Sequence, residues 1–269
     1  VLACGTAYHA GMGAKYAIEK WSHIPVEVEL ASEFRYRDPI VDKETLVIAI
    51  SQSGETMDTL MALRHAKEAG AKVLAICNTN SSTIPRESDA VIYTHAGPEI
   101  AVASTKAFLT QVVATYLIGL YLGQAVGTLS ERQIEALYNE MLELPAKIEQ
   151  ILETVEPLRE LTRSFADSSS VLFLGRHVGY PVALEGALKL KELAYMHAEG
   201  FAGGELKHGP IALIDQGTPV IAIVPNTHDH GLDEKMLSNI QEVRARGAKV
   251  IAIAAEGIEI PGAAHVIRI

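Results

Sequence analysis

Hydrophobic residues in the first half of the chain are gathered in short runs that are rich in Val and Ile. These runs lie at residues 1–4, 26–30, 45–50, 72–77 and 89–94. Uninterrupted hydrophobicity over so few residues predicts strands that are covered on both faces. Amphipathic stretches lie between them, such as 57–69, which Gly70 closes at the helix C-terminus. The alternation predicts an α/β fold in which crossover helices join parallel strands.

The same pattern occurs a second time. Residues 1–5 resemble 171–175, the sequence Val-Ile-Ala-Ile of 47–50 recurs at 220–223, and 70–76 agrees with 247–253 at six of seven positions. Between the copies, residues 129–166 lack strand signals, and Ser130 with Gln133 has the spacing of a helical capping box. We therefore predict a first domain over 1–128, a helical connector over 129–166 and a second domain over 167–269. Each domain is expected to be a parallel β-sheet sandwiched by helices, flavodoxin- or Rossmann-like.

Composition and charge narrow the class of protein. Hydrophobic residues make up 48% and charged residues 21% of the 269 residues, which is typical of a globular protein. The net charge of −10 argues against general nucleic-acid binding. Two cysteines are too few for a disulfide framework, and with no visible signal peptide we expect a cytoplasmic protein. Because Val1 begins within a predicted strand, we also expect a piece of a longer chain.

One segment is long enough to cross a membrane. Residues 107–126 carry no charge. The segment nevertheless contains Thr110, Gln111, Thr115 and Gln124, and no basic flank or second hydrophobic span accompanies it. We interpret it as a helix buried in a core or subunit interface and expect no membrane insertion.

A polar loop follows the strand predicted at 45–50. Its sequence is Ser51-Gln52-Ser53-Gly54-Glu55-Thr56, and a helix comes next. In open α/β sheets, ligands bind beyond the carboxyl ends of strands, where a helix N-terminus offers free N–H groups to an anion. The alternative is an ordinary capped helix whose Ser and Thr side chains bind only their own backbone. The corresponding position in the second copy contains Pro225 and lacks the serines, so we predict one anion site per chain, in the first copy.

The second copy carries a charged stripe on an otherwise apolar helix. Glu185, Lys189 and Glu192 are spaced i, i+4 and i+7, which places them along one face. A carboxylate and an ammonium held together in a cleft can transfer protons, but the same spacing also serves surface ion pairs that support a helix. His208 follows in a segment bent by glycines and a proline, where it is a candidate acid or base.

One short polar segment of the second copy raises the question of a metal site. His228, Asp229 and His230 could suggest metal binding, but no third ligand at helical or hairpin spacing supports it. We read them as a polar loop and expect no metal.

Together these segments resemble the isomerase (synthase) domain of the glucosamine-6-phosphate synthase family, the glutamine–fructose-6-phosphate aminotransferases, over nearly the whole chain. That domain consists of two sugar isomerase (SIS) domains. The residues that carry the resemblance are Leu2-Ala3-Cys4-Gly5-Thr6, Ala31-Ser32-Glu33-Phe34-Arg35-Tyr36-Arg37, Ser51-Gln52-Ser53-Gly54-Glu55-Thr56, Val102-Ala103-Ser104-Thr105-Lys106-Ala107-Phe108, Ala183-Leu184-Glu185-Gly186-Ala187-Leu188-Lys189-Leu190-Lys191-Glu192 and Gly204-Glu205-Leu206-Lys207-His208-Gly209-Pro210.

The resemblance implies a substrate and a role for each matching residue. The substrate is fructose 6-phosphate, which is converted with ammonia into glucosamine 6-phosphate without a cofactor. Glu192 moves the proton between C2 and C1, Lys189 stabilises the developing oxyanion, and His208 opens the sugar ring from the neighbouring subunit of a homodimer. The residues implied to hold the phosphate are Ser51, Gln52, Ser53 and Thr56, and those implied to line the sugar are Cys4, Gly5, Thr6, Val102 and Ser104.

The chain also departs from the family. Nothing in it matches the family's glutaminase domain or the C-terminal tail with its imine-forming lysine. We therefore expect an isomerase-domain fragment that binds the sugar phosphate, with doubtful full activity. The alternatives are a non-catalytic sugar-phosphate-binding SIS module, or another SIS enzyme such as a sugar-phosphate isomerase or a deglycase.

Overall fold

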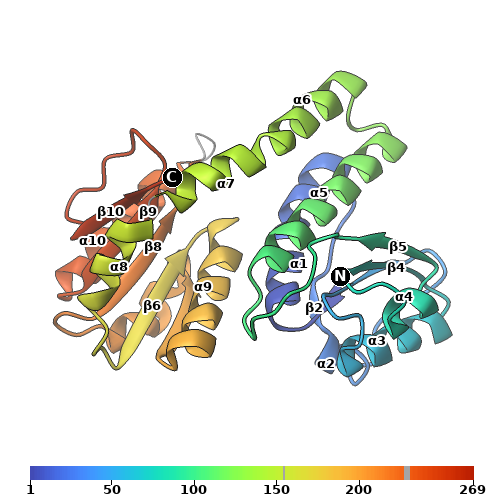
Figure 1. Cartoon of the computed structure of the whole chain (residues 1–269), viewed down its shortest axis with the longest axis horizontal. Helices are drawn as coiled ribbons and strands as arrows, with labels where there is room; N and C mark the ends of the chain where they lie inside the picture. Colours follow the sequence, from blue (N-terminus) through green and yellow to red (C-terminus); the bar gives the residue numbers. More distant parts are fainter. Residues whose placement is uncertain (154, 227–230) are drawn as a thin grey trace. The chain divides into compact units, whose positions relative to one another are not determined.

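The computed structural model describes residues 1–153, 155–226 and 231–269. Its backbone contacts divide the chain into two units, Val1–Tyr138 and Asn139–Ile269. Each unit contains one five-stranded sheet with helices packed on it (Figure 1). The α/β class and the presence of two similar domains are therefore confirmed.

The sheet of the first unit is parallel throughout, with the strand order β2-β1-β3-β4-β5. All five strands predicted from the hydrophobic runs are present. The first two are only two residues long, so the central strands carry most of the ladder. The strands are β1 (Leu2–Ala3), β2 (Glu29–Leu30), β3 (Leu46–Ser51), β4 (Lys72–Cys77) and β5 (Ala90–Tyr93).

Helices cover both faces of this sheet because alternate strand residues point to opposite sides. Val47 and Ala49 of β3 pack in a core with the short helices and α3, whereas Ile48 and Ile50 pack in a second core with α1 and α5. The continuous hydrophobicity of the strand is thus explained by two cores rather than one. The helices are α1 (Gly5–Ser22), α2 (Ala31–Phe34), α3 (Met57–Glu68), α4 (Thr83–Glu87) and α5 (Lys106–Val126).

The second unit repeats this arrangement. Its parallel sheet has the order β10-β9-β8-β6-β7, which is the first sheet's order when matching strands are compared. The register repeats too, because Ile50 pairs with Ile76 in the first sheet and Ile223 with Ile253 in the second. The strands are β6 (Ser170–Gly175), β7 (His197–Ala202), β8 (Pro219–Val224), β9 (Lys249–Ala254) and β10 (His265–Arg268).

Two helices cover opposite faces of the second sheet. Met236 and Ile240 of α10 lie in one core, and Ala183 and Ala187 of α9 lie in the other. The remaining elements are α6 (Glu131–Leu142), α7 (Leu144–Leu152), α8 (Val155–Arg163), α9 (Gly179–Ala194), η1 (Gly203–His208), η2 (Pro210–Leu213) and α10 (Leu232–Ala245).

Helices α6, α7 and α8 follow α5, and α6 begins with a capping box. Gln133 Oε1 accepts the backbone N–H of Ser130 at 3.0 Å, and Ser130 Oγ accepts the backbone N–H of Gln133 at 3.4 Å. Both contacts satisfy donors that would otherwise be free at a helix start. The boundary between the two units falls within α6, after Tyr138.

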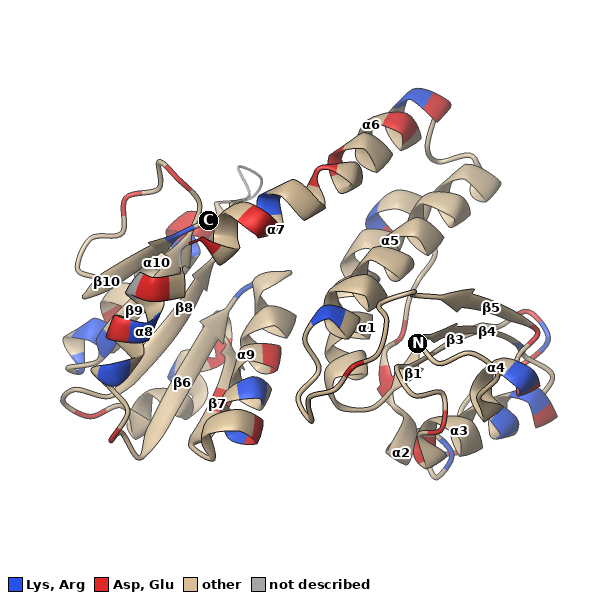
Figure 2. Cartoon of the chain, viewed as in Figure 1, with Lys and Arg blue, Asp and Glu red and all other residues tan. Residues whose placement is uncertain are grey.

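Helix α5 is uncharged after Lys106 (Figure 2) and is long and apolar enough to cross a membrane by length and composition. In the structure it packs along α1, with Ala114 and Ile118 in the core shared with the sheet. Its opposite face, which includes Leu117 and Tyr121, is exposed. The predicted burial therefore holds for one face of this helix within the chain.

Candidate functional site

A cavity of about 180 Å³ lies at the carboxyl ends of β1 and β3 in the first unit. This is the edge of a parallel sheet at which ligands bind. A larger hollow of about 730 Å³ lies at the amino ends of the same strands and is mostly apolar. The smaller cavity is lined mostly by side chains with hydroxyl, amide or thiol groups. Its lining residues are Cys4, Thr6, Ala7, Ile50, Ser51, Gln52, Ser53, Thr56, Thr59, Ser104 and Gln111.

The loop between β3 and α3 forms one wall of this cavity. Ser51 is 2% exposed, and its Oγ accepts the backbone N–H of Gly54 at 3.0 Å and lies 2.9 Å from Thr56 Oγ1. Ser53 Oγ accepts the backbone N–H of Glu55 at 3.2 Å. Thr56 occupies the N-cap position of α3 but makes no side-chain cap. The first amides of α3 are therefore not capped by the Thr56 side chain.

Gly54 is required by the shape of this loop. Its φ is +66°, in the left-handed region that side chains rarely adopt. A Cβ atom there would lie 1.9 Å from Ser82 Oγ, so α4 and the loop could not approach as they do. Because the loop and α4 lie this close together, the Gly54 carbonyl accepts a hydrogen bond from the N–H of Ile84 at 2.9 Å.

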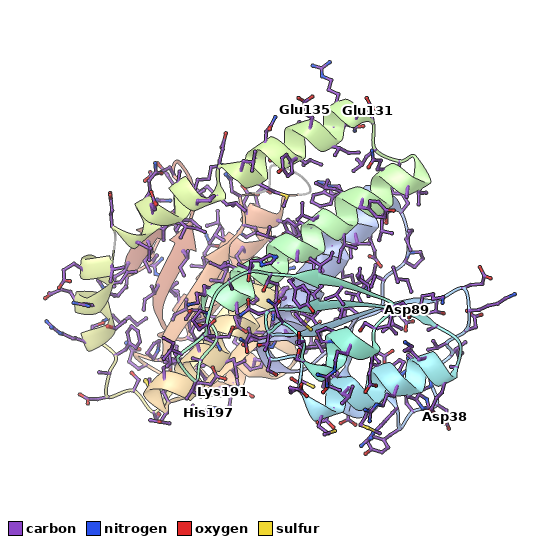
Figure 3. All side chains as sticks on the ribbon, turned by 45° about the vertical axis from the view of Figure 1, so that its right-hand side comes forward. Asp38, Asp89, Glu131, Glu135, Lys191 and His197 are labelled. Atoms are coloured by element: carbon purple, nitrogen blue, oxygen red, sulfur yellow. The ribbon has the colours of Figure 1, made fainter. Side chains whose placement is uncertain are left out.

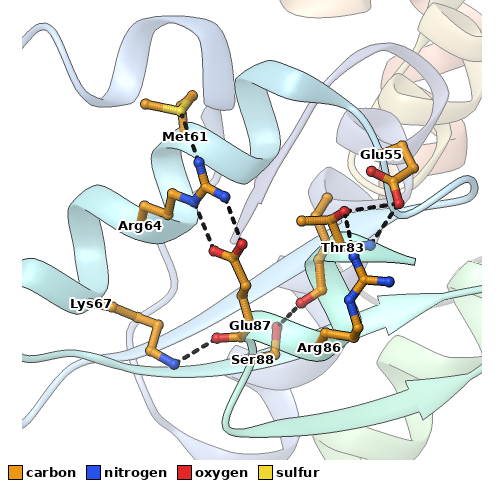
Figure 4. Close-up of polar contacts among 9 residues, drawn as sticks. Glu55, Met61, Arg64, Lys67, Thr83, Arg86, Glu87 and Ser88 are labelled. Atoms are coloured by element: carbon orange, nitrogen blue, oxygen red, sulfur yellow. Dashed lines mark hydrogen bonds and ion pairs between the residues drawn. The ribbon is translucent and has the colours of Figure 1, made fainter. Parts of the chain in front are cut away.

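Glu55 fastens the outer side of the loop to the start of α4 (Figure 4). Its Oε1 accepts the backbone N–H of Thr83 at 2.7 Å and the hydroxyl of Thr83 at 3.0 Å. These two donors, the hydroxyl first, hold the pKa of the Glu55 carboxyl below its ordinary value. The only acidic side chain of the loop is thus engaged with α4.

Other polar groups that line the cavity have few hydrogen-bond partners. Thr59 is fully buried, and its hydroxyl lies 3.9 Å from Cys4 Sγ. Ser104 Oγ and Gln111 Oε1 are buried and accept or donate no hydrogen bond within the described parts of the chain. Buried polar groups are nearly always hydrogen-bonded in proteins, so these two groups are suited to bind a ligand or water.

The cavity brings together most of the residues predicted for the sugar phosphate. All four loop residues predicted to hold the phosphate line it, and so do Cys4, Thr6 and Ser104. Gly5 begins α1, and Val102 is 96% exposed; neither lines the cavity.

Two polar lining residues, Thr59 and Gln111, were not predicted from the sequence. The available signal was weak in both cases. Each is a polar residue among the buried positions of its helix, α3 for Thr59 and α5 for Gln111.

The charged stripe of the second unit lies on α9. Lys189 Nζ is 3.3 Å from Glu185 Oε1 and 2.6 Å from Glu192 Oε2, so one ammonium lies between two carboxylates. The Glu185 side chain is 8% exposed, whereas those of Lys189 and Glu192 are 20% and 30% exposed. Lys191, labelled in Figure 3, is exposed. The three stripe residues therefore form one partly buried cluster rather than a solvated surface pair.

His208 ends η1 and is exposed. The two residues before it anchor the segment: Leu206 is fully buried, and Lys207 Nζ lies 2.9 Å from Glu242 Oε1 on α10. Gly209, with a φ of +135°, allows the chain to turn directly after it. The imidazole thus lies at the surface of the second unit.

The group considered above as possible metal ligands, His228, Asp229 and His230, lies outside the described residues. Among the described residues, no group of three His, Cys, Asp or Glu side chains is placed to hold a metal ion.

Comparison with known proteins begins with the domain family. The sequence profile described as SIS domain matches residues 1–121 and 164–266. The first stretch contains the whole first sheet, and the second contains all of the second sheet except the last two residues of β10. The glutamine–fructose-6-phosphate aminotransferase (isomerizing) of Streptomyces coelicolor is 67% identical over the whole chain, and that of Mycobacterium tuberculosis is 64% identical. The chain spans 44% of the length of these relatives.

A solved structure agrees with the sequence matches. The C-terminal domain of glucosamine-fructose-6-phosphate aminotransferase from Francisella tularensis superposes with a TM-score of 0.95 at 44% identity, over the whole of this chain and 76% of that one. A phosphosugar isomerase described as putative, from Clostridium difficile, shares the fold at 20% identity with a TM-score of 0.86. The resemblance inferred from the motifs is therefore confirmed.

Proposed function

The chain belongs to the SIS domain family, and we propose that it is the isomerase part of a glutamine–fructose-6-phosphate aminotransferase. Its substrate is fructose 6-phosphate, and with ammonia its product is glucosamine 6-phosphate. The ammonia comes from a glutaminase domain in the whole enzyme. The observation that supports this most directly is the cavity at the carboxyl ends of β1 and β3, which joins an anion-binding loop to a polar wall.

The phosphate binds at the loop through neutral donors. Ser51, Ser53 and Thr56 supply hydroxyls, Gln52 supplies an amide, and the start of α3 supplies backbone N–H groups at the positive end of the helix dipole. No Lys or Arg is present in residues 51–56. A net charge of −10 is a property of the whole surface and does not oppose such a local site.

The sugar extends from the phosphate along the other wall. Cys4, Thr6 and Ser104 line it within the cavity. The remaining residues proposed to contact the sugar, Gly5 at the start of α1 and the exposed Val102 before α5, lie outside the cavity lining.

Side chains of α9 carry out the proton transfer. Ammonia first condenses with the C2 carbonyl of the opened sugar, which gives an imine and releases water. Glu192 then takes a proton from C1 and delivers one to C2, while the C1 hydroxyl loses its proton and the imine nitrogen gains one, which leaves an aldehyde at C1 and an amine at C2. The negative charge that develops on the C1 oxygen is stabilised by the ammonium of Lys189. Glu185, the most buried of the three, holds Lys189 in place through the 3.3 Å ion pair.

His208 opens the sugar ring before this step, and it acts in the site of a neighbouring subunit. Its exposed position at the end of η1 suits a residue that serves another chain. A homodimer is then part of the mechanism. We place the protein in the cytoplasm, with no metal or cofactor.

The test is the formation of glucosamine 6-phosphate from fructose 6-phosphate and ammonia in the complete gene product. Replacing Glu192 by Gln keeps the size of the side chain and removes the base, so turnover should fall by about a hundredfold or more. Glu256→Gln, an exposed change in the same unit, serves as the matched control and should leave turnover unchanged. Normal turnover of Glu192→Gln would remove the proposed base. Absence of turnover in the unmodified protein, together with intact sugar-phosphate binding, would favour a non-catalytic binding module.

A further inference from the structure

Gln111 is the most unusual polar residue in the first unit. It lies in the middle of α5 and is 2% exposed. The buried residues one turn away on α5 are Ala107, Ala114 and Thr115. Its amide oxygen has no hydrogen-bond partner among the described residues, and its side chain lines the cavity next to the phosphate loop.

Burying this amide oxygen without a partner costs folding free energy, and an apolar side chain of the same length would avoid that cost. A glutamine at this position is therefore explained by a partner that the chain does not supply. Ser104 Oγ, which belongs to another residue that lines the cavity, also has no hydrogen-bond partner among the described residues. Two such groups at one cavity indicate a polar partner, a ligand group or the water that it displaces, rather than an isolated defect of packing.

The loop and the side of the cavity that Gln111 lines differ in their hydrogen-bonding groups. The loop wall presents hydrogen-bond donors, which suits an anion, whereas the Gln111 side presents an amide oxygen, which accepts and therefore suits a hydroxyl. A phosphate oxygen would be repelled by that amide oxygen. The arrangement fits a ligand that carries a phosphate at one end and hydroxyls along its body.

We propose that Gln111 is a sugar-binding residue whose amide oxygen accepts a hydrogen bond from a hydroxyl of the bound sugar phosphate, so that the cavity distinguishes a sugar phosphate from phosphate alone. The proposal rests on the proposed function, because it assumes that the phosphate binds at residues 51–56. It adds a contact from α5 to those made by the loop and by β1.

The experiment compares two ligands and matched variants by calorimetry. Gln111→Met keeps the length of the side chain but removes its hydrogen-bonding groups. It should bind fructose 6-phosphate about three- to tenfold more weakly, the value of one neutral hydrogen bond, and bind inorganic phosphate as the unmodified chain does. Gln124→Met, on the exposed part of α5, is the control and should change neither affinity. Gln111→Leu gives a second apolar variant should the first not fold.

Thermal unfolding separates binding from structure. Removing an unpartnered amide should leave the Tm of the free protein unchanged or raise it. Unchanged affinity for fructose 6-phosphate in Gln111→Met would overturn the inference, and so would an equal loss for both ligands, which would show a displaced loop. If the unmodified chain bound neither ligand, the proposed function itself would fail, a result distinct from these.

Discussion

Ser51 and Ser53 should respond differently to the same substitution. Ser51 is 2% exposed, and its Oγ satisfies the N–H of Gly54 and contacts Thr56 Oγ1. Ser51→Ala leaves that buried N–H unsatisfied, which costs about 1–3 kcal/mol of the free energy of unfolding. Ser53 instead accepts an N–H at the exposed Glu55, where water can replace it, so Ser53→Ala should cost under about 0.5 kcal/mol.

Both substitutions should weaken phosphate binding. A hydrogen bond to a charged group contributes about 1.5–3 kcal/mol, so each variant should bind fructose 6-phosphate about 10- to 150-fold more weakly. Ser51→Ala therefore loses both stability and affinity, whereas Ser53→Ala loses affinity alone. This separation distinguishes a phosphate site from a helix cap that serves only its own backbone.

The assay can be confined to the unit that contains the loop. Trp21 is the single tryptophan of the chain and lies on α1 in the first unit, with its ring centroid 5.5 Å from that of Tyr116. Its fluorescence during urea unfolding reports the stability of that unit, and calorimetry reports the affinity. Unchanged affinity in Ser53→Ala would refute the assignment of the phosphate, and unchanged stability in Ser51→Ala would refute the buried contact with Gly54.

Two further predictions concern the same cavity. Gly54→Ala should lower the free energy of unfolding by about 1–3 kcal/mol and abolish measurable sugar-phosphate binding, because the φ of +66° and the approach of Ser82 both exclude a Cβ atom. Urea unfolding measures the first effect and calorimetry the second. Wild-type values in both would contradict the prediction. In the native protein at neutral pH, iodoacetamide should modify the half-buried Cys4 and not Cys77, because Cys77 is fully buried and burial raises the pKa of its thiol to about 12. Fructose 6-phosphate should slow the reaction of Cys4, as followed by mass spectrometry, and equal rates with and without the ligand would place the sugar elsewhere.

Much of the fold was predictable because each strand has its own signal. The run at residues 45–50 is apolar on both faces, and the structure shows why: its odd- and even-numbered residues pack in two different cores. The recurrence of 70–76 at 247–253 predicted the duplication, and the shared register of the two sheets confirms it. The order of the strands within each sheet was not predicted, because it depends on where each crossover helix returns the chain.

The pattern of residues alone indicated the site only at the loop over residues 51–56, and the resemblance added Cys4, Thr6 and Ser104. The serines at 51 and 53 follow a strand and precede a helix, a position with a known relation to ligands. Gln111 and Thr59 lie within helices, and no pattern in the surrounding sequence distinguishes a polar residue that faces a cavity from one that faces solvent. Their position is fixed by how α5 and α3 pack on the sheet, which is a property of the whole unit.

The central claim is that this chain holds a sugar phosphate by its phosphate at residues 51–56. Calorimetric titration of the unmodified chain with fructose 6-phosphate, beside the same titration with fructose, tests it most directly. We predict saturable binding at one site per chain for fructose 6-phosphate and no detectable binding for fructose. Equal affinity for the two sugars, or an unchanged affinity for fructose 6-phosphate after both serines are replaced by alanine, would contradict it.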